Sequence, residues 1–294
     1  MKALGSSFVA ATIPDAPSFS FRTAPSMTAP ILQSKLPRVG TTVFSVMSAL
    51  AAKHAAINLG QGFPDFDCDP QLVNAVTEAM QQGHNQYPLM TGVPLLRERV
   101  AAKTEALHGV RYDAATEITI TAGATQGILS AILAVVRQGD EVIVLEPCYD
   151  SYTPNIELAG GVAVPVRLTP GTYEPDFDAI SAAVSSRTRA IIVNSPHNPS
   201  GRVWTAEHWQ KLAEIIVIRD IWVLSDEVYE HMVFDGVAHQ SAALNPLIRE
   251  RAFVISSFGK TFHVTGWKIG TVCAPTPLTV EFRKVHQYTV FTAN

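Results

Sequence analysis

The stretch Glu117–Val136, EITITAGATQGILSAILAVV, decides the fold, because a strand, a glycine turn and a helix follow one another in it. The run EITIT is rich in β-branched residues, which favour strands. The small residues of AGATQG form a turn, and the apolar run from Thr125 to Val136 predicts a helix. A strand that leads directly into a helix is the beginning of an α/β pattern.

The pattern continues to residue 274. Six more runs are predicted to be strands: EVIVL (141–145), VAVPV (162–166), RAIIVN (189–194), IWVLSD (221–226), FVISS (253–257) and IGTVCA (269–274). Further helices are predicted at residues 42–54, 70–82, 94–107, 150–159, 177–184 and 206–218. Nearly continuous apolar strands that alternate with helices are typical of a mainly parallel sheet with both faces covered. The sequence therefore predicts an α/β fold with three layers, α/β/α, around a mainly parallel seven-stranded sheet.

The composition is that of a globular protein and excludes several classes of function. Of the 294 residues, 47% are hydrophobic and 16% are charged, and the net charge is -4. A mildly acidic chain with scattered lysines and arginines lacks a basic surface for a nucleic acid backbone. No apolar run approaches the roughly 18 residues of a membrane span. Small molecules are therefore the expected partners, with no nucleic acid and no membrane.

The cysteines and the N-terminal residues bear on the compartment. Cys68, Cys148 and Cys273 are odd in number and lack the spacing of a metal site or a CxxC motif. No metal is therefore predicted, and free thiols in a reducing compartment are expected. Residues 1–26 have only a weak apolar stretch, interrupted by Ser, Thr and Pro, which makes a poor signal peptide. We expect a disordered extension at residues 1–26 and a cytoplasmic protein.

The residues directly after the strands should hold the functional site, because ligands of open α/β sheets bind beyond the carboxyl ends of the strands. After EITIT, the turn at Gly123 leads into a helix near Thr125, whose free N–H groups suit a phosphate. After EVIVL, Tyr149 suits stacking on a flat ring. Each signal is weak alone, since a glycine turn and a half-buried tyrosine are also ordinary features of packing.

Two further strands are followed by stronger signals. After RAIIVN, Asn198 stands between two prolines in SPHNPSG, and so stiff a loop can hold an amide in a fixed direction. An asparagine that caps its own turn fits the sequence equally well. After IWVLS, Asp226 places a carboxylate at the end of a buried strand, where a cationic partner is expected, and Tyr229 follows within reach. The alternative is that Asp226 and Glu227 form a solvated acidic pair.

The stretch SSFGKTFHVTGWKIG (256–270) contains Lys260. A desolvated lysine has a lowered pKa, and its free amine attacks carbonyl carbons to form a Schiff base. Ser257 and Lys268 flank it and suit a phosphate, although an exposed loop lysine without a role is the simpler alternative. Together, an anion site, an aromatic ring, an oriented amide, a buried acid and a lysine nucleophile are the parts that bind pyridoxal 5'-phosphate (PLP).

At this point the chain resembles the class I and II aminotransferases of fold type I. Seven motifs in the family's order carry the resemblance: INLGQGFPDF (57–66), NQYPLMTG (85–92), TAGATQG (121–127), EPCYDSY (146–152), NSPHNPSG (194–201), SDEVYEH (225–231) and SSFGKTFHVTGWKIG. It extends from about Gln33 to Asn294 and is strongest to the methionine aminotransferase branch, which is similar to the kynurenine and glutamine transaminases. The resemblance implies ping-pong transfer of an amino group from methionine, an aromatic amino acid, kynurenine or glutamine to a 2-oxo acid.

The resemblance also implies a role for each cofactor-binding residue. Lys260 would form the Schiff base with PLP, Asp226 would pair with the protonated pyridine nitrogen, and with Tyr229 they are the expected catalytic residues. Tyr229 and Asn198 would bind the phenolic oxygen of the ring, and Tyr149 would stack on its face. The phosphate would be bound by four residues: Ala124 and Thr125 through their amides, and Ser257 and Lys268 through their side chains.

Four other positions match family residues that serve the substrate or the neighbouring subunit. Tyr87 would reach the phosphate of the neighbouring subunit, which implies a homodimer with shared active sites. Phe291 and Thr292 would line the substrate pocket of the partner. Gly62 and Asn198 would lie against the substrate.

The resemblance assigns residues 27–66 to the small domain and residues 67–294 to the large PLP-binding domain. Relatives continue beyond the point where this sequence ends and supply an arginine that binds the substrate carboxylate. The small domain is therefore expected to be incomplete and catalysis to be weak or absent. Two alternatives stay open: a carbon–sulfur β-lyase acting on cysteine S-conjugates with the same cofactor, and a PLP-binding protein without catalytic activity.

Overall fold

The computed structural model describes residues 31–62, 64 and 66–294. The expected extension at residues 1–26 and the first residues of segment 27–66 lie outside this range. The chain divides into two compact units, Met1–Ser34 and Lys35–Asn294. The described residues of the first unit, 31–34, contain no helix or strand, and all elements below belong to the second unit.

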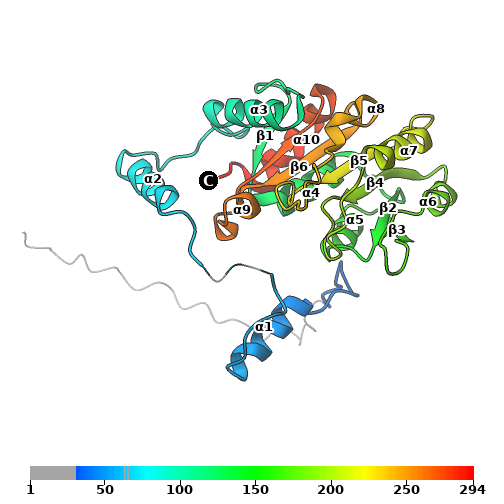
Figure 1. Ribbon diagram of the computed structural model, residues 1–294, viewed down its shortest axis with the longest axis horizontal. Coiled ribbons are helices and arrows are strands. Elements are labelled where there is room, and N and C mark those ends of the chain that lie inside the picture. Colours follow the sequence, from blue (N-terminus) through cyan, green and yellow to red (C-terminus); the bar gives the residue numbers. More distant parts are fainter. Residues whose placement is uncertain (1–30, 63, 65) are drawn as a thin grey trace, which may run out of the picture. The chain divides into compact units, whose positions relative to one another are not determined.

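A single sheet organises the second unit (Figure 1). Its strands are β1 (Ile118–Thr121), β2 (Glu141–Glu146), β3 (Val162–Arg167), β4 (Thr188–Asn194), β5 (Trp222–Asp226), β6 (Ala252–Ser257) and β7 (Gly270–Cys273). Their order is β1-β7-β6-β5-β4-β2-β3. β7 is antiparallel to both neighbours, and the other pairs are parallel. The predicted mainly parallel seven-stranded sheet is confirmed. The first and last residues of each predicted run lie within one residue of the bounds of the observed strand.

Helices precede, connect and follow the strands; those from residue 94 onward cover the sheet, whereas the first two bury no residue. The helices are α1 (Val43–Lys53), α2 (Pro70–Gln81), α3 (Pro94–His108), α4 (Gly123–Val135), α5 (Tyr152–Leu158), α6 (Phe177–Ala183), α7 (Ala206–Ile216), α8 (Pro246–Arg249), α9 (Phe258–Thr261) and α10 (Thr276–Val290), with 3-10 turns η1 (Ala242–Leu244) and η2 (Thr265–Trp267). Side-chain hydrogen bonds to free backbone N–H groups stabilise the first turn of several helices. At the start of α7, for example, Thr205 Oγ1 accepts a hydrogen bond from the His208 N–H (3.2 Å). The predictions for α1 to α7 are confirmed, whereas α8, α9 and α10 were not predicted from the sequence pattern.

Alternate side chains of each strand build two apolar layers. On β2, Val142 and Val144 pack in one cluster with α4, α5 and α10, whereas Ile143 and Leu145 pack in another with α6, α7 and α8. Full burial of each such side chain stabilises the fold by about 1.5–3 kcal/mol. A third cluster joins α3 to β1 and β7. The three-layer α/β/α prediction is therefore confirmed, and the layers hold the carboxyl ends of the strands in fixed positions.

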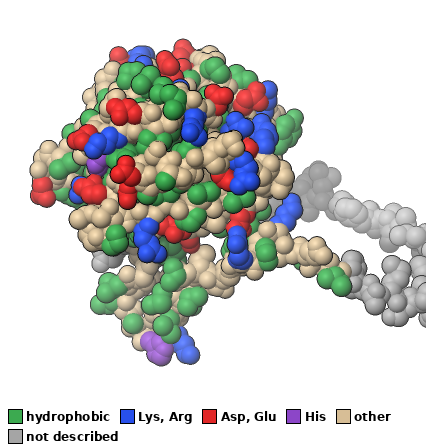
Figure 2. Space-filling view, turned by 90° about the vertical axis from the view of Figure 1, so that its right-hand side faces the viewer, with side chains coloured by type: hydrophobic (Ala, Val, Ile, Leu, Met, Phe, Trp, Pro, Cys, Tyr) green, Lys and Arg blue, Asp and Glu red, His purple; other side chains and the backbone are tan. Residues whose placement is uncertain are grey.

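The surface shows no concentration of one charge on the face in Figure 2, where basic and acidic side chains are interspersed. Among the residues that the structure describes, no helix combines the length and the apolar character needed to cross a bilayer. The three cysteines are free, with Cys273 buried and Cys68 and Cys148 half-buried.

Candidate active site

A pocket lies at the carboxyl ends of β4, β5 and β6, beside the start of α4. It has a volume of about 160 Å³. It is lined by Gly123, Ala124, Thr125, Ile128, Tyr149, Asn194, Asn198, Asp226, Val228, Tyr229, Ser257, Lys260, Thr265, Lys268 and Ile269. The fold thus brings together nine predicted site residues: Ala124, Thr125, Tyr149, Asn198, Asp226, Tyr229, Ser257, Lys260 and Lys268.

The turn before α4 has a glycine conformation that lets a ligand approach its backbone closely. Gly123 has a φ of +78°, in the left-handed region that glycine adopts without strain. Gly270 of β7 packs directly against this turn, since a Cβ on it would lie 2.7 Å from Ala124 N. The N-cap residue of α4, Ala122, makes no side-chain cap hydrogen bond. The first N–H groups of α4 are therefore left for an anion.

Two side chains add to this anion site. A Cβ on Gly123 would lie 3.3 Å from Lys268 Nζ, so the ammonium group lies directly against the turn. Lys268 itself has a φ of +56°, a conformation that is costly for a lysine and is held by the surrounding structure. Ser257, at the end of β6, adds a buried hydroxyl group to the same pocket. Backbone donors, a hydroxyl and a cation together suit a phosphate.

Lys260 lies in α9, directly after β6. Burial lowers the pKa of Lys260 and the positive charge of Lys268 lowers it further, while Asp226 partly opposes both. The Lys260 Nζ atom lies 5.5 Å from the ring centre of Tyr229. A lowered pKa leaves more of the free amine at neutral pH, and this is the form that attacks a carbonyl carbon.

Asp226 is a buried carboxylate at the end of β5, with 4% of its surface exposed. Burial raises the pKa of Asp226 to about 6. Hydrogen bonds from Tyr152 Oη (2.6 Å) and Val228 N (3.3 Å) oppose this effect, and so does the charge of Lys260. None of the ion pairs found among the described residues includes Asp226. A buried and unpaired carboxylate suits a ligand that brings its own positive charge.

Asn198 and Tyr229 meet from two neighbouring loops. The Asn198 Nδ2 atom donates to Tyr229 Oη at 3.5 Å, so the amide faces the pocket rather than capping its own turn. Asn194 ties the two loops together, because its Oδ1 accepts the Asn198 N–H (2.6 Å) and its Nδ2 donates to Asp226 O (2.9 Å). The amide, the phenol and the carboxylate are thus held at a fixed spacing.

Two residues of this site, Tyr152 and Asn194, were not predicted from the sequence. Tyr152 is buried at the start of α5, and its ring meets that of Tyr149 edge-on with centroids 5.7 Å apart. The sequence feature that could have indicated Tyr152 is the pair of tyrosines three residues apart in EPCYDSY. The feature that could have indicated Asn194 is its position as a polar residue at the end of the apolar run RAIIVN.

Four predicted residues lie outside the pocket. Tyr87 and Phe291 form a second cluster, with perpendicular rings whose centroids are 5.2 Å apart, and Thr292 Oγ1 donates to Pro88 O nearby (3.2 Å). Tyr87 is 78% exposed. Gly62 is exposed and does not line the pocket.

Comparisons with known proteins agree on one family. The family described as "Aminotransferase class I and II" matches residues 55–293. The methionine aminotransferase of Escherichia coli (strain K12) is 51% identical over 264 residues, which are 90% of this chain and 68% of that protein. A probable N-succinyldiaminopimelate aminotransferase of Mycobacterium tuberculosis is 46% identical over 257 residues, which are 87% of this chain and 65% of that protein.

A solved structure shows the same fold. It is the crystal structure of YbdL from Escherichia coli, for which a methionine aminotransferase function was identified. The TM-score is 0.87 at 50% sequence identity, and the match covers 90% of this chain and 69% of that chain. The chain spans about two thirds of the length of these similar proteins.

Proposed function

The chain belongs to the class I and II aminotransferase family, and from this premise we propose that it binds PLP and transfers an amino group from an amino acid to a 2-oxo acid. The family predicted from the sequence motifs is confirmed. The observation that carries the proposal is the pocket, which collects Lys260, Asp226 and the start of α4 from separate parts of the sheet.

The pocket fits PLP at each functional group of the cofactor. The turn before α4, with Ser257 and Lys268, suits the phosphate. The buried carboxylate of Asp226 suits the protonated pyridine nitrogen. The amine of Lys260 suits the aldehyde. When bound, PLP supplies an electron sink for the negative charge that remains when an amino acid loses its α-proton.

The side chains around the ring would orient it. Asp226 would keep a proton on the pyridine nitrogen, because a carboxylate in a buried site stabilises a cation beside it. Asn198 and Tyr229, already 3.5 Å apart, would bind the phenolic oxygen. Tyr149 would stack on the ring face, and the N–H groups of Ala124 and Thr125 would bind the phosphate.

Lys260 would have two tasks. Its amine would hold the aldehyde group of the cofactor, and Nζ would take the proton from the α-carbon of the substrate. Both tasks need the neutral amine, which the lowered pKa of Lys260 favours. Lys260, Asp226 and Tyr229 are therefore the proposed catalytic residues.

The proposals for the substrate and for the partner subunit rest on the similarity to known aminotransferases. We propose methionine as the amino donor, because the methionine aminotransferase is 51% identical; N-succinyldiaminopimelate, kynurenine, glutamine and aromatic amino acids are the competitors to test. No arginine lines the pocket among the described residues. We propose a homodimer, to which the exposed cluster of Tyr87, Phe291 and Thr292 would contribute. Gly62 would lie against the substrate. Residues 27–66 would contribute to the small domain, and residues 67–294 would form the large PLP-binding domain.

A spectral titration tests the proposal. The purified chain with PLP should show the visible absorbance of a lysine-bound cofactor, and Lys260→Ala should lose it. Lys284→Ala is the matched control, because Lys284 is an exposed lysine of α10 that pairs with Glu281. Addition of methionine should convert the spectrum to that of pyridoxamine phosphate, with release of an oxo acid that keeps the sulfur.

Other outcomes separate the alternatives. Pyruvate and ammonia from a cysteine conjugate would identify a β-lyase, and an unchanged spectrum with every amino acid would identify PLP binding without catalysis. An absorbance that survives in Lys260→Ala would exclude the proposed role of this lysine.

A further inference from the structure

Glu227, the neighbour of Asp226, is buried. The alternative in which the two acids form a solvated pair is wrong, because Glu227 is 1% exposed. Asp226 and Tyr229 line the PLP pocket, whereas Glu227 and Glu230 line a separate small cavity beneath α3 and β6. The polar side chains of the turn after β5 therefore point alternately into the PLP pocket and into the cavity beneath α3 and β6.

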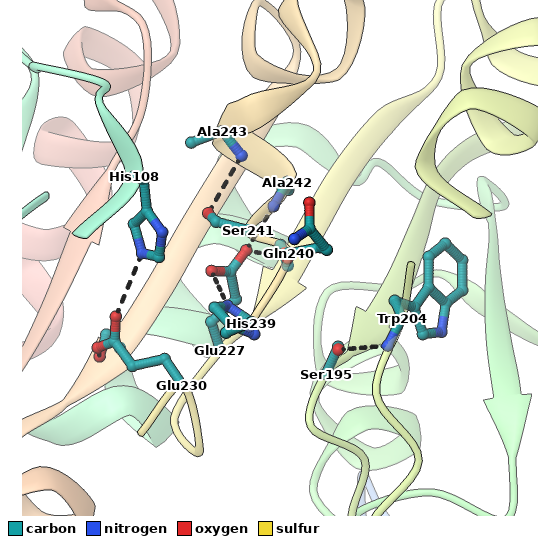
Figure 3. A network of polar contacts seen from close by, with 12 residues as sticks. His108, Ser195, Trp204, Glu227, Glu230, His239, Gln240, Ser241, Ala242 and Ala243 are labelled. Atoms are coloured by element: carbon teal, nitrogen blue, oxygen red, sulfur yellow. Dashed lines mark hydrogen bonds and ion pairs between the residues drawn. The ribbon is translucent and has the colours of Figure 1, made fainter. Parts of the chain in front are cut away.

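Three hydrogen bonds hold the Glu227 carboxylate. Oε1 accepts from Ser225 Oγ (2.7 Å) and from the backbone N–H of Ala242 (2.9 Å). Oε2 lies 2.8 Å from His239 Nε2. Figure 3 shows this carboxylate between His239 and Ala242. Glu227 thus ties the turn after β5 to the segment that begins η1.

Glu230 is a second anchor of the same turn. Its Oε1 accepts from Lys103 Nζ (2.7 Å) and from Ser256 Oγ, and its Oε2 lies 3.8 Å from His108 Nε2 (Figure 3). Burial raises the pKa of Glu230, but His108, Lys103 and Ser256 outweigh burial and bring the pKa to about 2. Glu230 is therefore ionised across the physiological range and ties the turn to α3 and β6.

The two anchors contact each other through their histidine partners, and both are adjacent in sequence to the site residues. The rings of His108 and His239 meet edge-on with centroids 5.7 Å apart. Asp226 precedes the first anchor, and Tyr229 lies between the two. Within the described part of the chain, no group of three or more His, Cys, Asp or Glu residues is placed to hold a metal ion.

We infer that Glu227 is a positioning residue, whose buried hydrogen bonds aim Asp226 and Tyr229 into the PLP pocket. The inference rests on the proposed function. It assigns Glu227 no contact with cofactor or substrate, because the side chain points away from the PLP pocket. Its effect must therefore pass through Asp226 and Tyr229, and not through the phosphate site at the start of α4.

The test compares the affinities of Glu227→Ala and Glu227→Gln for two probes. Glu227→Ala leaves three buried donors without an acceptor, so PLP binding by absorbance titration should weaken about tenfold or more. Glu227→Gln keeps an acceptor for Ser225 and Ala242 and should restore the affinity to within about threefold of wild type. Binding of inorganic phosphate, followed by phosphorus NMR, should change in neither variant, because its site lies on α4, Ser257 and Lys268.

Glu141→Ala is the matched control. Glu141 is a buried carboxylate, 7% exposed, that accepts from Ser185 Oγ and Arg187 Nε (2.9 Å) at the opposite end of the strands. Its loss should lower the melting temperature but leave PLP binding unchanged. In an Asp226→Ala background, the effect of Glu227→Ala on PLP affinity should be smaller than in the wild type, since only the route through Tyr229 remains.

Several outcomes would overturn the inference. One is wild-type PLP affinity in folded Glu227→Ala, and another is an equal loss of PLP and phosphate binding. If Glu227→Ala does not fold, Ser225→Ala provides a milder variant, because it deletes one oxygen and thereby removes one hydrogen bond to Glu227. Ser225→Ala should weaken PLP binding about 2- to 10-fold, and unchanged affinity would overturn the inference. Absence of PLP binding by the wild type would instead refute the proposed function, and this inference with it.

Discussion

At the scale of single residues, the hydroxyl group of Tyr152 bears most directly on the charge of the pocket. It donates to Asp226 Oδ2 at 2.6 Å, from a side chain that is itself buried. Burial disfavours the charged carboxylate, whereas this hydrogen bond favours it. The balance leaves the pKa of Asp226 at about 6, so the group is ionised at neutral pH by a narrow margin.

Tyr152→Phe should shift this balance. Removal of the hydroxyl group raises the pKa of Asp226 above its present value, so a larger fraction is protonated at pH 7. Affinity for PLP should fall about 2- to 10-fold at pH 7. The pH below which PLP is released should move upward, as followed by absorbance titration between pH 5 and 9.

Asp226→Asn provides the control for this prediction. In that background the carboxylate is absent, so Tyr152→Phe should no longer move the pH profile. The other groups that act on position 226, which are Val228, Glu227 and Lys260, are the same with and without the Tyr152 hydroxyl group. A profile that still shifted would show that Tyr152 acts through a different group.

At the scale of elements, β7 fixes the start of α4. A Cβ on Gly270 would lie 2.7 Å from Ala124 N and 2.8 Å from Gly123 C, both backbone atoms that cannot move without displacing the turn. The strand and the helix can therefore approach only because position 270 has no side chain.

Gly270→Ala should push α4 away from β7. Overpacking of this kind costs about 1–3 kcal/mol in the free energy of unfolding. The displaced turn should also weaken binding of inorganic phosphate. Gly40→Ala is the control, because a Cβ there would have open space. Urea unfolding and phosphorus NMR measure both effects, and a fully stable Gly270→Ala protein would contradict the close packing.

The longest of the three helices that the sequence pattern did not predict, α10, was missed for a physical reason. Its apolar stripe consists of Leu278 and Phe282, and the third position of that stripe is His286. His286 is buried, with Nδ1 3.0 Å from Gln126 Nε2 and Nε2 3.1 Å from Met90 O. A buried histidine satisfied by partners distant in sequence is indistinguishable from a surface residue in the sequence pattern.

At the scale of the whole molecule, Asp226 makes stability depend on pH. Its folded-state pKa of about 6 exceeds the ordinary aspartate pKa of 3.8. The folded state therefore holds this proton more tightly, and the resulting stability is complete below pH 3.8 and lost as pH rises through 6. Without cofactor, the difference in free energy of unfolding between wild type and Asp226→Asn should shrink by on the order of 2–3 kcal/mol from pH 4 to pH 7. Urea unfolding across this range measures it, and a constant difference would contradict the raised pKa.

Local signals predicted most of the molecule. The strands, the helices α1 to α7 and nine pocket residues follow from apolar periodicity and from the residues after each strand. Tyr152, Asn194 and Glu227 were not assigned functions because their roles depend on partners that the fold brings close: Tyr152 meets Asp226 across 74 positions of sequence. The directions of strand neighbours, such as antiparallel β7, likewise depend on the assembled sheet.

The separation of Asp226 from Glu227 has a consequence for how β5 tolerates changes in length. Successive residues of a strand point to opposite faces, so the loss or gain of one residue within Trp222–Asp226 would reverse the faces to which the two acids point. Loss of one residue would put Glu227 where Asp226 now lies, and gain of one would put Asp226 where Glu227 now lies, too short to reach His239 and Ala242. Changes by two residues would preserve the arrangement of faces. Insertions or deletions of an even number of residues in β5 should therefore keep the two acids on their present faces, and those of an odd number should not, whatever the identity of its apolar residues.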